Sequence, residues 1–157
     1  MKNILIHKNQ KGFTLIELLI VVAIIGILAT LLMSNFIGVR QRARDGQRKA
    51  DISQIQAALE QYRADNGSYP SSLSNCGGTI QSASNIVYMQ KIPCDPSGAT
   101  YYNAGSYYYY GNGSTYTITA CLENTNDSQG TATAPTGNPS GCTTNSGSGF
   151  YYTVNNP

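Results

Sequence analysis

The chain has 157 residues, of which 41% are hydrophobic and 11% charged, and its formal net charge is +2 at pH 7. This length suffices for one compact domain with a core of modest size. The excess of basic side chains is confined to the first dozen residues, so the composition argues against a basic protein that binds nucleic acid, and no such partner is expected.

Residues 1–12 form a short leader that contains Lys2, Lys8, Lys11 and the histidine His7. A secretory signal is cleaved at a small-residue site that follows its apolar run. Here the run continues through Leu32 and Met33 without such a site. We therefore expect the apolar run to be retained in the mature protein.

Residues 13–33 are predominantly apolar and contain one charged residue, Glu17. A helix of this length can cross the ~30 Å hydrocarbon core of a bilayer, so a membrane-spanning segment is predicted. A carboxylate in such a segment costs about 2.5–3.5 kcal/mol on insertion scales, and it therefore usually has a partner or a task. A purely structural alternative is that Glu17 interacts with the dipole at the start of the helix.

Apolar residues continue to recur at steps of three and four over residues 34–66, with basic residues between them. This spacing predicts that the helix continues as an amphipathic helix. Its apolar face would comprise Val39, Ala43, Ile52, Ile55, Leu59 and Tyr62, and the interspersed basic residues are Arg40, Arg42, Arg44, Arg48 and Lys49. Gly67 supplies a left-handed cap after Asn66, and Pro70 prevents continuation.

Residues 67–157 form a C-terminal region of loops and predicted strands. Segment 68–92 has little periodicity and is predicted to be a connecting loop with one hydrophobic patch at residues 86–89. Strands are predicted at 101–110 and 114–122, which are rich in Tyr, Thr and Ile and are separated by a Gly-Asn-Gly hairpin signal.

The composition shifts to Asn, Thr, Ser, Gly and Pro over residues 124–149, which predicts a surface loop. A last strand is possible at 150–154. The predicted fold class is therefore α+β, with a long N-terminal helix packed on a small antiparallel sheet.

The four cysteines Cys76, Cys94, Cys121 and Cys142 all lie in the C-terminal region. An even number of cysteines in a chain with a membrane-targeting start predicts two disulfides in an oxidising compartment. A zinc site is the alternative, but the spacings contain no C-x-x-C pair. Three pairings are possible for four cysteines.

Charge and cysteines disagree on membrane orientation. The five basic residues between Arg40 and Lys49 outnumber the three lysines of the leader, which favours a cytoplasmic C-terminus. Disulfides require the outer compartment, and these charges begin seven residues beyond Met33. We therefore predict an extracytoplasmic C-terminal region.

Residues 11–17, Lys-Gly-Phe-Thr-Leu-Ile-Glu, and the apolar run to Ala29 resemble the N-terminal signature of type IV pilins and type II secretion pseudopilins. The resemblance implies that an aspartyl membrane peptidase cuts after Gly12 and that the new N-terminal Phe13 is methylated. A residue without a Cβ suits such a site because it lets the protease approach the backbone. The resemblance also implies that Glu17 attracts the α-amino group of Phe13 in a neighbouring subunit and so sets the register of a filament.

Residues 50–70 and 88–98 resemble the major pseudopilin of type II secretion, so the likeness covers about two thirds of the chain. Ser34 departs from the proline that the family often has there. The acidic calcium-binding loop of the major pseudopilin has only Glu123 and Asp127 as weak counterparts, which fit a solvated polar turn equally well. No other cofactor or metal is expected.

The cysteines are a further departure, because pilins more often carry a C-terminal disulfide than that pseudopilin does. By this likeness, a bond between Cys121 and Cys142 would close the C-terminal loop, and one between Cys76 and Cys94 would clamp the segment after the helix. The two other pairings stay open.

The implied organisation is a leader (1–12), a transmembrane and assembly half of the helix (13–33), an amphipathic half (34–66) and a disulfide-tied C-terminal region (67–157). The implied function is a structural subunit of a type IV pilus-like or pseudopilus filament. Its partners would be the prepilin peptidase and methyltransferase, other subunits, an inner-membrane assembly platform and lipid. It would be a single-pass protein of the bacterial inner membrane before it enters a periplasmic or cell-surface filament.

An enzyme is not expected, because the mature chain would contain no histidine and shows no evident pair of nucleophile and base. The alternative function is a membrane-anchored extracytoplasmic binding or adhesion domain that does not assemble. For that function, residues 107–110, four consecutive tyrosines, would present aromatic faces to sugars or DNA. Strand tyrosines that alternate between core and solvent explain the same pattern.

Overall fold

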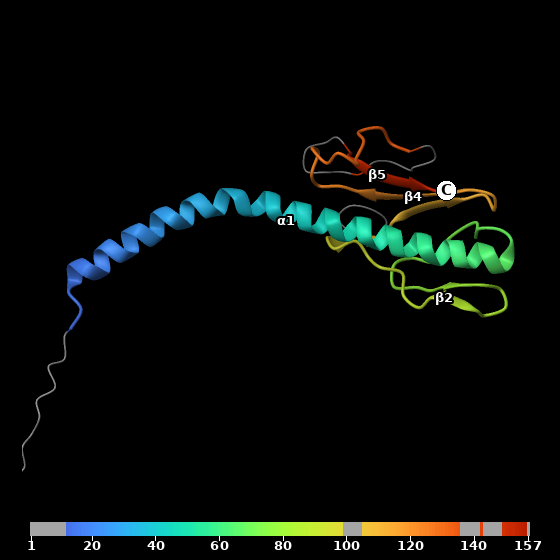
Figure 1. The fold of residues 1–157 in the computed structure, drawn as a ribbon, viewed down its shortest axis with the longest axis horizontal. Helices are drawn as coiled ribbons and strands as arrows, with labels where there is room; N and C mark the ends of the chain where they lie inside the picture. Colours follow the sequence, from blue (N-terminus) through green and yellow to red (C-terminus); the bar gives the residue numbers. More distant parts are fainter. Residues whose placement is uncertain (1–11, 99–104, 136–141, 143–148, 157) are drawn as a thin grey trace, which may run out of the picture. The chain divides into compact units, whose positions relative to one another are not determined.

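The structure is a computed structural model that describes residues 12–98, 105–135, 142 and 149–156 (Figure 1). The chain divides into two compact units, Met1–Ile37 and Gly38–Pro157. The described residues form a long helix, α1 (Leu15–Asn66), and five strands in two antiparallel sheets. The predicted α+β fold is therefore confirmed.

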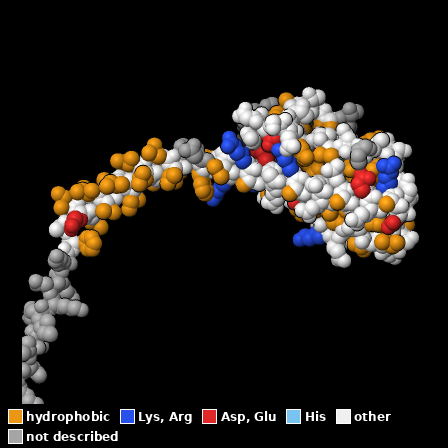
Figure 2. All heavy atoms as spheres, in the orientation of Figure 1, with side chains coloured by type: hydrophobic (Ala, Val, Ile, Leu, Met, Phe, Trp, Pro, Cys, Tyr) orange, Lys and Arg blue, Asp and Glu red, His pale blue; other side chains and the backbone are white. Residues whose placement is uncertain are grey.

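The first unit contains the apolar part of α1. Leu15–Met33 has a mean hydropathy of 2.9 and is long and apolar enough to cross a membrane, and none of it is buried within the structure. Figure 2 shows hydrophobic side chains along this part of the helix. A helix that is apolar all round needs lipid or other apolar helices as its surroundings.

Local sequence signals define the two ends of α1. The helix begins at Leu15, two residues later than the start of the apolar run, because Thr14 caps it. At the other end Gly67 adopts a φ of 77° and its N–H donates to the carbonyl of Arg63 at 2.7 Å. This is the left-handed cap that the sequence predicts.

The second unit contains both sheets. Strands β1 (Ile80–Gln81) and β2 (Val87–Met89) pair with each other, and β3 (Tyr108–Gly111), β4 (Tyr116–Cys121) and β5 (Tyr151–Asn155) form the second sheet in that order. The β3–β4 hairpin and the last strand were both predicted. The hairpin turn is closed by Asn112, whose side-chain oxygen accepts hydrogen bonds from the N–H groups of Ser114 and Thr115.

The C-terminal part of α1 packs against both sheets. Ile52, Ile55 and Leu59 are fully buried. They belong to one apolar core with Ile80 and Ile92 from the β1–β2 region and with Tyr116 and Ile118 from β4. In Figure 1 the two sheets lie along different sides of this part of the helix. Helix and sheets therefore share a single core.

The loop predicted at residues 68–92 is wrong in part, because it contains β1 and β2. These strands have two and three residues, too few to show a periodic pattern in the sequence. In the strand predicted at 101–110, the described residues 105–107 are not part of a strand, and β3 begins at Tyr108. Residues 101–104 of that prediction lie outside the described part.

The apolar face predicted for residues 34–66 is wrong at its beginning. Val39 and Ala43 are exposed, while the charged residues Asp45, Arg48 and Asp51 are buried. The buried residues still recur at steps of three and four, but in the first two turns of the buried face they are charged. Hydrophobic periodicity cannot detect such a face.

Candidate functional site

The bond between Gly12 and Phe13 lies before the first turn of α1. Both residues are exposed, and the Phe13 side chain is 92% exposed. A Cβ built on Gly12 would have no atom within 4 Å. The part of the chain that the structure describes therefore leaves this peptide bond open to a protease. The rest of the leader, with His7, lies outside the described residues.

Glu17 and Thr14 form a reciprocal cap on the first turn of α1. The backbone N–H and the hydroxyl of Thr14 both donate to Glu17 Oε2 at 2.8 Å, and the N–H of Glu17 donates to the Thr14 hydroxyl at 3.3 Å. This is the capping box expected for Thr-x-x-Glu. Thr14 was not among the predicted site residues, although its spacing from Glu17 indicates a capping box.

The structure joins Cys76 to Cys94 and Cys121 to Cys142, with Cα atoms 4.8 and 5.5 Å apart. Both separations lie in the range usual for disulfides. This is the pairing that the family resemblance implies. One bond closes the segment that contains the β1–β2 pair, and the other ties the end of β4 to residue 142.

Arg48 is fully buried and lies at the centre of a group of polar side chains. We call Asp45, Arg48, Asp95, Ser97 and Glu123 the Arg48 cluster. Arg48 donates to both oxygens of Asp95 at 2.7 and 2.9 Å, to Asp45 at 2.7 Å and to Ser97 at 2.9 Å. It also pairs with Glu123 Oε1 at 2.9 Å. Three carboxylates therefore surround one guanidinium.

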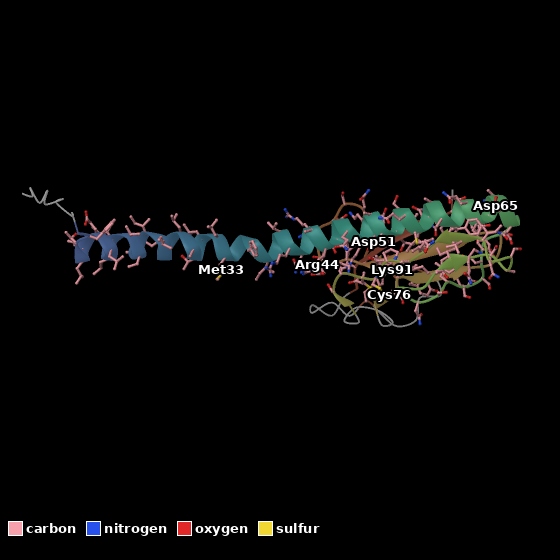
Figure 3. The ribbon with its side chains drawn as sticks, turned by 90° about the horizontal axis from the view of Figure 1, so that it is seen from below. Met33, Arg44, Asp51, Asp65, Cys76 and Lys91 are labelled. Carbon is pink, nitrogen blue, oxygen red and sulfur yellow. A yellow bond between two sulfur atoms is a disulfide. The ribbon has the colours of Figure 1, made fainter. Side chains whose placement is uncertain are left out.

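The carboxylates of the cluster also organise the backbone around it. Asp45 accepts hydrogen bonds from the N–H groups of Glu123 and Asn124, and Asp95 accepts one from the N–H of Ser97. Glu123 makes a second ion pair with Arg44, which Figure 3 labels on the same helix. The cluster thus fixes the turn after Cys94 and the chain after β4 to the helix.

Electrostatic balance in the cluster favours the charged forms. Burial lowers the pKa of Arg48, but hydrogen bonds and charge from Asp95, with help from Asp45 and Glu123, outweigh this and hold the pKa above its ordinary value. Burial raises the pKa of Glu123, but hydrogen bonds from Arg44 and Arg48 outweigh this and hold its pKa below the ordinary value. This cluster was not predicted from the sequence, because its members are scattered along the chain.

Asp51 and Tyr107 form a second buried polar contact. The Tyr107 hydroxyl donates to Asp51 Oδ2 at 2.6 Å. Burial raises the pKa of Asp51, which the Tyr107 hydrogen bond partly offsets, and burial together with that hydrogen bond also raises the pKa of Tyr107. This pair fixes the start of the β3 region to the helix.

The two calcium candidates contact basic side chains. Glu123 lies in the Arg48 cluster, whereas both oxygens of Asp127 accept from Lys49 Nζ at 2.7 Å. Lys49 also donates to Gln129 Oε1 at 2.9 Å. The described residues contain no group of three or more His, Cys, Asp or Glu that could hold a metal ion. Glu123 and Asp127 are therefore each engaged by basic side chains.

The four tyrosines at 107–110 do not form an exposed aromatic row. Tyr107 and Tyr108 are buried, Tyr109 is half-buried, and Tyr110 is 53% exposed. The Tyr109 hydroxyl donates to the carbonyl of Pro70 at 2.6 Å. Strict alternation between core and solvent is therefore wrong for this run, and Tyr110 alone presents much of its ring to solvent.

Comparison with known proteins gives two family matches. The family described as prokaryotic N-terminal methylation motif matches residues 7–33, and the family described as type II secretion system (T2SS), protein G matches residues 35–134. No solved structure matches the chain.

Several curated relatives carry the name type II secretion system core protein G. That of Pseudomonas aeruginosa is 35% identical over 104 residues, which cover 60% of this chain and 73% of the relative. That of Escherichia coli K12 is 32% identical over 59% of this chain and 70% of the relative. That of Dickeya chrysanthemi is 30% identical over 60% and 68%, respectively.

Removal of the Arg48 guanidinium should destabilise the second unit strongly. Arg48→Met would leave three carboxylates without their shared cation, which typically costs about 3–5 kcal/mol. Arg42→Met, at an exposed position of the same helix, should change stability by less than about 0.5 kcal/mol. Thermal unfolding of both variants, followed by circular dichroism, measures the difference. Equal stability of the two variants would contradict the central role of Arg48.

The contribution of Glu123 should depend on pH. Because its folded-state pKa lies below the ordinary value of 4.5, the ionised form stabilises the protein above that value. This stabilisation is lost as pH falls through the folded-state pKa. Glu123→Gln should therefore be less stable than the wild type at pH 7, and the gap in Tm should narrow below about pH 4.5. A gap that stays constant down to acid pH would argue against an ionised Glu123.

Chelation of divalent cations should leave the fold unchanged. The carboxylates of Glu123 and Asp127 are satisfied by Arg44, Arg48 and Lys49, so excess calcium or EDTA should not alter Tm. Lys49→Ala is the variant to compare with the wild type, because it removes the cation that both oxygens of Asp127 contact. A marked loss of wild-type Tm in EDTA would show that a metal ion contributes.

Proposed function

The chain belongs to the type II secretion system protein G family, and we propose that it is a pseudopilus subunit whose processing and assembly depend on Gly12, Phe13 and Glu17. The methylation-motif match at residues 7–33 supports synthesis as a prepilin. The observation that carries the proposal is that one family's processing motif and the other family's domain adjoin in this chain, at residues 33 and 35.

Processing takes place at the exposed start of the helix. The prepilin peptidase would cut between Gly12 and Phe13, and the methyltransferase would modify the new amino group of Phe13. Exposure of both residues supports this, as does the open space around Gly12. The capping box at Thr14 and Glu17 lies on the mature side of the cut, so removal of the leader leaves the first helical turn intact.

Assembly uses the carboxylate of Glu17. Both hydrogen bonds that Thr14 donates go to Oε2, and Oε1 accepts none from the residues that the structure describes. An approaching amino group of Phe13 from another subunit can therefore pair with Oε1 while the cap persists. In an apolar environment such an ion pair offsets the cost of keeping the carboxylate away from water.

The apolar segment and the disulfides support a membrane-anchored, periplasmic location. The apolar segment Leu15–Met33 anchors the subunit in the inner membrane, and the second unit, with its two disulfides, lies in the periplasm. The partners are the processing enzyme, further pseudopilin subunits, membrane lipid and the inner-membrane assembly platform. The role is structural, and no catalytic residue is assigned.

Two variants of Glu17 separate its charge from its capping role. Gln at this position can still complete a capping box, whereas Ala cannot. Shearing should release filaments from cells that overproduce the wild type. If the charge recruits the Phe13 amino group, cells that overproduce Glu17→Gln or Glu17→Ala should release none. Filaments from Glu17→Gln at the wild-type level would show that only the cap matters.

Mass spectrometry of the same proteins provides the control. Wild type and both variants should lack residues 1–12, carry one added methyl group and lack four hydrogens because of the two disulfides. Unprocessed variants would mean that Glu17 acts in cleavage rather than in assembly. Loss of a different number of residues from the wild type would overturn the assignment of Gly12.

A further inference from the structure

The outer edge of β5 carries backbone groups, at strand spacing, that no described residue pairs with. Figure 1 shows β5 next to β4 at the end of the three-stranded sheet. The N–H of Leu122 donates to the carbonyl of Phe150, and the N–H of Asn156 donates to that of Tyr116. Because backbone groups alternate in direction along a strand, the N–H and C=O groups of Phe150, Tyr152 and Val154 point toward β4. The N–H and C=O groups of Tyr151, Thr153 and Asn155 must then point to the outer edge.

A short segment covers only the first of these three edge positions. Thr131 and Tyr151 exchange two backbone hydrogen bonds, both 2.8 Å long. Among the described residues, the backbone N–H and C=O groups of Thr153 and Asn155 have no partner at this edge. The sheet therefore ends in two donors and two acceptors that repeat every second residue.

The chain on the N-terminal side of Thr131 is held away from this edge. An antiparallel continuation of the Thr131–Tyr151 bridge would place Gln129 opposite Thr153. Gln129 instead donates its N–H to Asp127 Oδ1 at 2.9 Å, and its side chain accepts from Lys49 on the helix. Lys49 also binds both oxygens of Asp127. This turn is therefore tied to α1 rather than paired with β5.

Open space borders Thr153 and Asn155 and reaches Thr117 on the neighbouring strand β4. A cleft of about 410 Å³ is lined by Thr117, Thr131, Thr133, Ala134, Pro135, Thr153 and Asn155. Its volume is in the range of clefts that hold small ligands, about 300–1,000 Å³. No described lining residue carries a charge, and most are threonines. The cleft therefore suits an uncharged segment with small or hydroxyl-bearing side chains.

We propose that the outer edge of β5 at Thr153 and Asn155, with this threonine-lined cleft, binds an extended, uncharged peptide segment of another protein by strand addition. The backbone of the segment pairs with the free groups of both residues, and its alternate side chains enter the cleft. This site lies wholly in the second unit and does not depend on the proposed filament role.

The test uses the full chain in detergent micelles and the acetylated, amidated peptide Thr-Val-Ser-Val-Thr. Binding should shift the amide NMR signals of Thr153 and Asn155 and slow their hydrogen exchange about fivefold or more, as expected for a new hydrogen bond. A peptide that is N-methylated at alternate residues keeps all backbone N–H groups along one of its two edges, so it should still bind. A fully N-methylated peptide should not bind.

Thr153→Pro is the matched protein variant. Proline at this position removes the backbone N–H of residue 153, which points away from β4. The β4–β5 ladder should therefore persist while peptide affinity falls. Thr153→Val keeps the N–H and should bind. Unchanged signals at Thr153 and Asn155, or equal shifts with the fully N-methylated peptide, would overturn the proposal even if Thr153→Pro fails to fold.

Discussion

The buried guanidinium of Arg48 is the interaction on which the arrangement of the second unit depends. A cation removed from water is tolerated only when hydrogen-bonding anions surround it, and here the anions come from the helix, from the turn after Cys94 and from the chain after β4. Apolar side chains pack acceptably in several ways, whereas a bidentate pair such as Arg48 with Asp95 requires one geometry. We infer that the apolar core supplies most of the stability and that the Arg48 cluster selects one position of the loops on the helix.

The two disulfides act on the same segments. Cys94 immediately precedes Asp95, and Cys121 lies two residues before Glu123. Each covalent bond therefore limits the freedom of a carboxylate that must reach Arg48. A cross-link that narrows the unfolded ensemble lowers the entropy lost when the ion pairs form. The disulfides and the ion pairs of Arg48 thus support each other on the same segments, whereas Ile55 and Leu59 belong to the apolar core.

How far the sequence predicts this molecule depends on how local the signal is. The apolar segment, the cap at Gly67, the β3–β4 hairpin and the last strand rest on neighbouring residues, and the structure contains all of them. The processing signature at Gly12 and Phe13 is also local. The Arg48 cluster could not be predicted, because Asp95 and Glu123 are 47 and 75 positions away, and a buried arginine looks like a solvent-facing one in a periodic pattern. Strands β1 and β2 were missed because they are too short to show alternation.

Glu17 and Arg48 place charge in apolar surroundings by opposite means. Arg48 is satisfied completely within its own chain, so its position serves the fold and leaves nothing for a partner to add. Glu17 is satisfied only in part, because Thr14 and the start of the helix engage one oxygen of its carboxylate. Such a cap keeps the side chain oriented and lowers the cost of holding it in a membrane, yet the other oxygen, Oε1, accepts no hydrogen bond from the residues that the structure describes. A fully neutralised carboxylate would have no reason to favour a neighbour, and an uncapped one would be costlier to insert. The partial cap therefore suits the role proposed for Glu17, in which the residue stays in lipid until another subunit supplies the opposite charge.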